Sequence, residues 1–211
     1  MESVLKKQNR IVIYGGSFNP PHIGHSHAAR AAADALQPDK MLILPSGISP
    51  NKNAAASAIS DRDRLAMCRI AFSGVPNAEI CELEIRRGGI SYTADTIHEI
   101  RRLYPEGELF LVIGSDMLQC FSRWYRSDFI AKECTLVPVL RGSEDRASAL
   151  NAAEALRKQF GAEIRFLRCD PLPAASSDIR TELIFGKKPE LLSEEVYQYI
   201  TEHNLYTGNQ I

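Results

Sequence analysis

The sequence has no excess of charge of either sign, because its 211 residues carry 25 basic and 26 acidic side chains, a formal net charge of −1. It also lacks any apolar run near the roughly 20 residues that a membrane-spanning helix needs. We therefore expect a protein that binds neither nucleic acid nor a membrane. The first residues are polar and contain no signal-peptide core, which predicts a cytoplasmic location.

The chain also lacks a Cys-x-x-Cys pair, and its five cysteines are widely scattered. This pattern is typical of reduced thiols that pack as small apolar side chains. No internal repeat and no long linker interrupts the chain, so we expect one domain over residues 1–211, flexible at residues 1–9. The oligomeric state stays open, with a homo-oligomer as one option.

Strand-like and helix-like segments alternate along nearly the whole chain. This order predicts an α/β fold, a Rossmann-like, doubly wound and mainly parallel sheet with helices on both faces. In such folds ligands bind at the carboxyl ends of the strands, near a topological switch point. Strands are expected at residues 10–14, 40–45, 78–85, 108–113, 135–140 and 163–167, and helices at 26–36, 61–72, 93–104, 147–160, 177–185 and 193–203.

The most informative segment is residues 15–25, GGSFNPPHIGH, which joins the first expected strand to the first expected helix. Gly15 and Gly16 let the backbone turn tightly and approach a ligand closely. The first turn of a helix has backbone N–H groups without internal acceptors, which suits a phosphate. His22 and His25 fall on one face of that turn, so both can donate hydrogen bonds to phosphate oxygens.

A zinc site is the alternative interpretation of this segment, because His27 lies close to both histidines. Zinc needs three or four ligands at suitable spacing, whereas the two remaining histidines, His98 and His203, are remote in the sequence. The segment is neither a G-x-G-x-x-G dinucleotide motif nor a P-loop. We therefore favour phosphate binding of another kind.

This segment resembles the G-G-x-F-x-P-x-H-x-G-H signature of the nucleotidyltransferase superfamily. Three phrases follow it in the chain: SYTADT at residues 91–96, WY at 124–125 and SSDIR at 176–180. With them, the chain resembles the bacterial nicotinate-nucleotide adenylyltransferases over nearly its whole length. The resemblance implies transfer of AMP from ATP to nicotinate mononucleotide, giving nicotinate adenine dinucleotide and pyrophosphate in NAD synthesis. It implies Mg²⁺ carried by ATP, with no metal site of the protein's own.

The resemblance also implies roles for individual residues. As catalytic groups it implies His22, His25, Lys52 and Arg180. For ATP it implies Gly15, Gly16, Ser17, Phe18, His22, His25, Gly114, Asp116, Ser176, Ser177 and Arg180, with residues 176–211 as a helical part that completes the ATP site. For nicotinate mononucleotide it implies Gly16, Ser46, Lys52, Thr93, Trp124 and Tyr125, with the Trp124 indole stacked on the pyridinium ring.

Two positions depart from the family pattern: Asn51 stands where a histidine is usual, and Ala175 stands where a hydroxyl residue is frequent. Phosphopantetheine adenylyltransferase shares the first signature, but it does not predict the SYTADT and WY phrases. A class I aminoacyl-tRNA synthetase would need a Lys-Met-Ser-Lys-Ser-like loop, which this sequence lacks. A nucleotide-binding regulator without catalysis is the alternative from another class, and it would not need both histidines together with Arg180.

Overall fold

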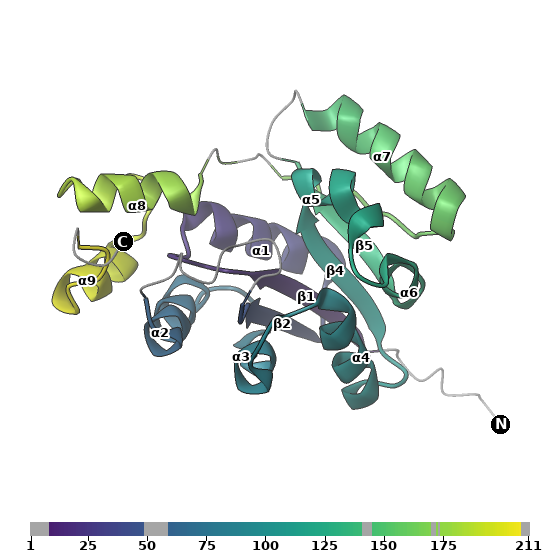
Figure 1. Cartoon of the computed structure of the whole chain (residues 1–211), viewed down its shortest axis with the longest axis horizontal. Helices are drawn as coiled ribbons and strands as arrows, with labels where there is room; N and C mark the ends of the chain where they lie inside the picture. Colours follow the sequence, from purple (N-terminus) through teal and green to yellow (C-terminus); the bar gives the residue numbers. More distant parts are fainter. Residues whose placement is uncertain (1–8, 49–58, 141–144, 170–171, 173, 208–211) are drawn as a thin grey trace.

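The computed structural model describes residues 9–48, 59–140, 145–169, 172 and 174–207. Within them, five strands form one fully parallel sheet in the order β3-β2-β1-β4-β5, which Figure 1 shows at the centre of the molecule. The predicted Rossmann-like class is confirmed. The strands are β1 (Arg10–Gly16), β2 (Lys40–Pro45), β3 (Ala78–Ile80), β4 (Glu108–Gly114) and β5 (Cys134–Val139).

Helices cover both faces of the sheet, because successive side chains of a strand point to opposite faces. In β1, Val12 joins an apolar cluster under two helices, whereas Ile11 and Ile13 join a larger cluster under four. None of the described helices is both long enough and apolar enough to cross a membrane. The first face carries α1 (Ile23–Leu36) and α2 (Asp61–Ala71), and the second carries α4 (Thr93–Leu103), α5 (Ser115–Cys120), α6 (Ser127–Glu133) and α7 (Asp145–Phe160).

The last two helices, α8 (Ser176–Ile184) and α9 (Glu194–Glu202), lie at the left of Figure 1, where α9 is beside α2 and α8 is beside α1. They form a third apolar cluster in which Ile179 and Ile200 pack with Met67 of α2. Tyr206, beyond α9, is buried in the same cluster. The C-terminal segment is thereby attached to the side of the sheet that also carries α1.

The switch point of the sheet lies between β1 and β4. β1 pairs with β2 on one side, with Gly15 opposite Leu44, and with β4 on the other, with Tyr14 opposite Val112. The chain leaves β1 toward α1 on one face and leaves β4 toward α5 on the opposite face. The loops after these two strands therefore diverge and leave room for a ligand at their carboxyl ends. The predicted phosphate-binding segment begins there.

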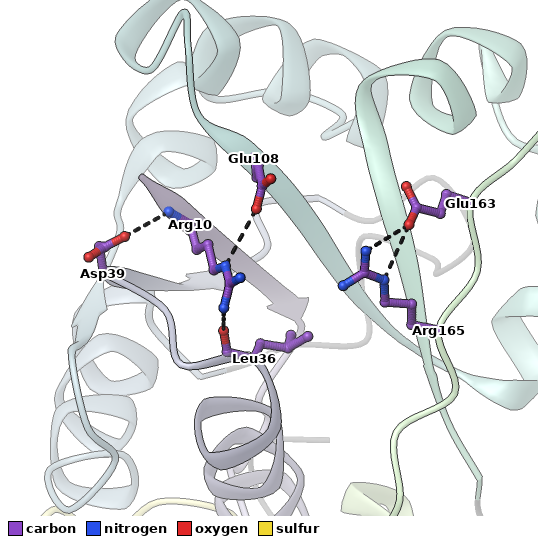
Figure 2. A network of polar contacts seen from close by, with 6 residues as sticks. All are labelled: Arg10, Leu36, Asp39, Glu108, Glu163 and Arg165. Atoms are coloured by element: carbon purple, nitrogen blue, oxygen red, sulfur yellow. Dashed lines mark hydrogen bonds and ion pairs between the residues drawn. The ribbon is translucent and has the colours of Figure 1, made fainter. Parts of the chain in front are cut away.

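At the other end of the strands, where they begin, polar contacts of Arg10 hold neighbouring segments together (Figure 2). Its backbone N–H donates to Asp39 at 2.9 Å, Nη1 donates to the carbonyl of Leu36 at 3.2 Å, and Nε lies 3.4 Å from a Glu108 carboxylate oxygen. The Arg10 and Glu108 side chains are about half exposed, so their ion pair contributes at most about 1 kcal/mol. These contacts align the starts of β1, β2 and β4 and leave the other edge for function.

The strand predicted at residues 163–167 is wrong. Ile164 and Leu167 make isolated bridges to Leu136 and Val139, but no continuous strand forms. The reason is Pro138 in β5. Leu136 N–H donates to the carbonyl of Glu163 and Leu167 N–H donates to the carbonyl of Pro138, but Pro138 has no N–H for the next bond of the series. Glu163 and Arg165 pair with each other beside this interruption (Figure 2).

The strand predicted at residues 78–85 is also wrong beyond Ile80, because residues Leu83–Arg87 form the short helix α3. Glu82 pairs with Arg86 one helical turn later at 3.1 Å, which supports a helix there. No helix was predicted at α5, at α6 or at the 3₁₀ helix Phe121–Arg123. Helix α1 begins at Ile23, three residues before its predicted start at residue 26.

Gly16 allows a close contact at the end of β1. A Cβ atom on Gly16 would lie 2.9 Å from two carbons of the Phe18 ring, which is 1% exposed and packed against Tyr14 and Phe72. We expect Gly16→Ala to lower the free energy of unfolding by about 1–3 kcal/mol, because the buried ring must move. Urea denaturation measures this. Gly15→Ala is the control, because its Cβ would meet nothing closer than Leu44 O at 3.9 Å; equal losses in both variants would contradict the explanation.

Candidate active site

The loop after β1 is held by a buried aromatic ring. Phe18 adopts a positive φ of 44°, and its ring lies inside the first apolar cluster. It makes an edge-to-face contact with the His25 ring at a centroid distance of 5.0 Å. The Phe18 side chain therefore anchors the loop to the protein interior. The backbone of the loop faces away from that interior, where a ligand can approach it. The hydrogen bonding between β1 and β2 extends past the ends of both strands, because the N–H of Ser46 donates to the carbonyl of Gly16 at 2.8 Å.

The two signature histidines open helix α1 as the sequence predicted. His22 is the N-cap residue and His25 is the third helical residue. The backbone N–H of His22 donates to Nδ1 of His25 at 3.2 Å, and the two rings stack with centroids 3.6 Å apart. Because Nδ1 of His25 accepts this bond, a neutral His25 ring carries its proton on Nε2. His25 is therefore set up to donate from Nε2.

The C-terminal segment binds the same loop from the other side. Arg180 Nη1 donates to the carbonyl of Asn19 at 2.7 Å, and the Ser176 hydroxyl donates to the carbonyl of Pro20 at 3.0 Å. The Tyr206 hydroxyl donates to Oδ1 of Asn19 at 2.6 Å. Ser176 and Arg180 thus lie at the loop after β1, and both bind its backbone.

Further residues predicted for ATP lie around this loop. Gly114 ends β4 and caps α5, so it sits beside the end of β1 at the switch point. Asp116 is in the first turn of α5 and half-buried, whereas Ser177, the second residue of α8, is exposed. Lys52 and Asn51 lie outside the described residues. The structure therefore gathers three predicted segments, 15–25, 114–116 and 176–180, around one sheet edge.

A second group of predicted residues lies at the start of α4. Thr93 is the first residue of α4, and the ring of Tyr92 before it contacts the ring of Tyr125 at a centroid distance of 4.9 Å. Trp124 is half-buried and packs against Phe121 at 5.3 Å. Its buried Nε1 has no hydrogen-bond partner within the described part of the chain. The SYTADT and WY phrases, about 30 residues apart, therefore form one aromatic corner.

The loop after β2 connects the two groups. Ser46 is bonded to Gly16, as described above, and Gly47 packs so closely on the turn before α4 that a Cβ there would lie 2.8 Å from the Ser91 hydroxyl. The N–H of Ser91 in turn donates to the carbonyl of Ile48 at 2.8 Å. A continuous series of contacts therefore leads from the loop after β1 through residues 46–48 to the start of α4.

The zinc interpretation finds no support in this arrangement. Nδ1 of His25 is bonded to a backbone N–H. Across the residues that the structure describes, no group of three or more His, Cys, Asp or Glu side chains could hold a metal ion. The donors at the loop are backbone N–H groups, imidazoles and a guanidinium, which suit the oxygen atoms of a phosphate.

A glycine-rich turn at a switch point, followed by a helix that opens with two histidines, is the site of a nucleotide-handling α/β protein. The cytidylyltransferase-like family model matches residues 13–182. A protein of Carboxydothermus hydrogenoformans, named "Probable nicotinate-nucleotide adenylyltransferase", is 34% identical over 199 residues, which cover 93% of this chain and 98% of the relative. One of Bordetella avium with the same name is 35% identical, with 93% and 98% covered.

Solved structures agree on the fold. A Plasmodium falciparum nicotinic acid mononucleotide adenylyltransferase complexed with NaAD superimposes with a TM-score of 0.77, at 18% identity, over 94% of this chain and 98% of that one. The chain belongs to the nicotinate-nucleotide adenylyltransferases, within the cytidylyltransferase-like family.

Sequence reasoning missed the residues that support the site from behind. Asn19 lies within the signature, so its role as an anchor could have been suspected. Arg64 of α2 donates to the carbonyl of Ser17 at 2.9 Å, and Tyr206 bonds Asn19 across 187 positions. No local pattern marks either residue, because their partners are brought close only by the fold.

Tyr206 provides a direct test of this support. Its hydroxyl is buried, and burial raises the pKa of Tyr206, so it remains a hydrogen-bond donor at neutral pH. We expect Tyr206→Phe to lower the free energy of unfolding by about 1–2 kcal/mol, because Asn19 Oδ1 loses a buried donor. Tyr199→Phe is the matched control, because it also removes a tyrosine hydroxyl that donates a hydrogen bond, here to Asp63. Asp63 is only half-buried and still accepts from the Ser60 hydroxyl at 2.6 Å, so we expect a smaller loss. Urea denaturation that gives Tyr199→Phe the larger loss would refute this account.

Proposed function

We propose that this protein transfers AMP from ATP to nicotinate mononucleotide, giving nicotinate adenine dinucleotide and pyrophosphate. The observation that carries the proposal is the continuous series of contacts between the histidine-bearing loop and the aromatic corner at Thr93, Trp124 and Tyr125. One end of this series suits a triphosphate and the other suits a flat ring with a carboxylate. The two substrates would therefore meet at the loop after β1.

In this reaction a phosphate oxygen of the mononucleotide attacks the α-phosphorus of ATP, and the bond from that phosphorus to the β-phosphate oxygen breaks. No covalent intermediate with the protein is needed. Chemistry of this kind depends on alignment of the two substrates and on donors that stabilise charge on the phosphates. Rigid backbone and fixed donors are what the loop after β1 provides.

ATP would lie over the loop, with its phosphates toward the start of α1. The backbone N–H groups of residues 15–18, His22 and His25 would bind the triphosphate, and Arg180 would approach from α8. Gly114 and Asp116 would lie at the ribose, and Ser176 and Ser177 would close the site at the start of α8. Lys52 would bring a second cation from the loop after β2. Mg²⁺ would arrive bound to ATP and neutralise part of the phosphate charge.

Nicotinate mononucleotide would lie between Ser46 and the aromatic corner. The half-buried indole of Trp124 can stack on the electron-poor pyridinium ring, a contact worth about 1–2 kcal/mol. The carboxylate would bind backbone N–H groups at the start of α4, near Thr93, and at Tyr125, because a helix N-terminus favours an anion. Since ATP is abundant inside cells, we place the reaction in the cytoplasm.

Pyrophosphate release with three acceptors tests the reaction. Nicotinate mononucleotide with Mg-ATP is expected to turn over much faster than either nicotinamide mononucleotide or phosphopantetheine, because both lack a carboxylate on a pyridine ring. Equal or faster turnover of phosphopantetheine would contradict the proposal and identify the activity as that of a phosphopantetheine adenylyltransferase. Binding of ATP without turnover of any acceptor would favour a regulator.

His25 is expected to act chiefly in the transition state, through Nε2. We expect His25→Asn to lower kcat by about 100-fold or more with a smaller change in KM, because the asparagine side chain can still accept from His22 N–H but offers no donor at the Nε2 position. Steady-state kinetics measure both constants. His98→Asn, an exposed histidine of α4, is the control. If His25→Asn kept a kcat near that of the wild type, His25 would have only a capping role.

A further inference from the structure

The proposed reaction leaves one buried carboxyl group without a role. Glu84, the second residue of α3, is 8% exposed. The Thr96 hydroxyl donates to its Oε1 at 2.8 Å. Burial raises the pKa of Glu84, and the bond from Thr96 and the positive charge of Arg87 partly offset this. A buried carboxyl group is costly unless it is bonded on several sides, so its partners are informative.

Those partners come from both segments proposed to bind the mononucleotide. Gly47, in the loop after β2, packs on both residues: a Cβ there would lie 2.8 Å from the Ser91 hydroxyl, in the turn before α4, and 3.1 Å from the Glu84 carbonyl oxygen. The Gly47 N–H and the Ser91 hydroxyl both lower the pKa of the Glu84 carboxyl group. Ser91 Oγ is buried and has no partner at hydrogen-bond distance within the described residues, so its contact with the carboxyl group is a longer, electrostatic one. Thr96 lies one turn inside α4. Glu84 thus stands between the loop that carries Ser46 and the helix that starts at Thr93.

The direction of each hydrogen bond makes an acceptor necessary at this point. Arg87 Nη2 donates to the Thr96 hydroxyl at 3.0 Å, so the proton of that hydroxyl is directed to Glu84. The Gly47 N–H can only donate. A carboxylate accepts on both oxygens, whereas a carboxamide of the same shape presents one NH₂ group to a donor. Glutamine at position 84 would therefore repel one of the two segments.

We propose that Glu84 is a positioning residue for the mononucleotide, which fixes the loop after β2 against the start of α4 through Gly47, Ser91 and Thr96. This inference rests on the proposed function, because those two segments are the ones that bind nicotinate mononucleotide there. Glu84 touches neither substrate. It acts through the placement of the backbone N–H groups at the start of α4.

Glu84→Gln tests the inference, with Glu82→Gln as the matched control, because Glu82 lies two residues earlier and pairs with Arg69 and Arg86 at the surface. We expect Glu84→Gln to raise KM for nicotinate mononucleotide about tenfold and to leave KM for ATP within about twofold. Titration of the single tryptophan's fluorescence with nicotinate mononucleotide alone should give the same shift in Kd. Glu82→Gln should match the wild type in all three.

An unchanged KM for nicotinate mononucleotide in Glu84→Gln would overturn the inference. Equal increases in both KM values would also overturn it, because a general loss of structure affects both substrates. If Glu84→Gln does not fold, Thr96→Val decides in its place: it keeps the shape of the side chain and removes one donor, so we expect a rise of about threefold for the mononucleotide alone. Failure of the proposed function is distinguishable, since the wild type would then release no pyrophosphate with nicotinate mononucleotide.

Discussion

The backbone carbonyls of the loop after β1 impose the constraint on which the site depends. Residues 17–20 turn away from the sheet, so their carbonyls leave the strand ladder and need other donors. Arg64 supplies the donor for Ser17, Arg180 for Asn19 and Ser176 for Pro20. Two of these three donors come from a helix more than 150 positions later in the chain. The shape of the loop after β1 and the docking of the C-terminal segment therefore depend on each other.

This arrangement would let Arg180 both hold the loop and bind the triphosphate in the proposed complex. A guanidinium has five N–H donors, and the bond to the Asn19 carbonyl uses one of them. Binding a phosphate does not require that bond to break, so the side chain loses little further freedom when a ligand arrives. The same loop is held from inside by the Phe18 ring and at its far end by the His22–His25 bond. A loop fixed at so many points is already ordered before ATP binds, which lowers the entropic cost of alignment.

The sequence predicted those structural features that residues close together in the chain determine. The β1 turn and the histidines at the start of α1 follow from residue types at fixed spacing, and the structure has them where expected. Several of the errors arise where a distant contact decides. Residues 163–167 have strand-like composition, but Pro138 in the neighbouring strand interrupts pairing. The segment after Ile80 alternates like a strand, but it turns into α3 and carries Glu84 into the interior. Tyr206 and Arg64 were missed for the same reason.

The two halves of the site are stabilised by different interactions, and this difference affects the expected selectivity for nicotinate over nicotinamide. The half at the loop after β1, where we propose that ATP binds, is built from donors that hold backbone carbonyls, so its geometry does not depend on any one charge. The half near Thr93 contains a buried carboxyl group, which would repel the carboxylate of nicotinate if its charge were unmatched. The Thr96 hydroxyl donates to Glu84 at 2.8 Å, and the Ser91 hydroxyl and the Gly47 N–H lower the pKa of this carboxyl group. Arg87 adds a positive charge and is itself paired with Glu99 at 2.8 Å. In the proposed complex the N–H groups at the start of α4 therefore remain available for the substrate's carboxylate. A nicotinamide ring would point either its carbonyl or its NH₂ at them, with a weaker bond in the first case and repulsion in the second.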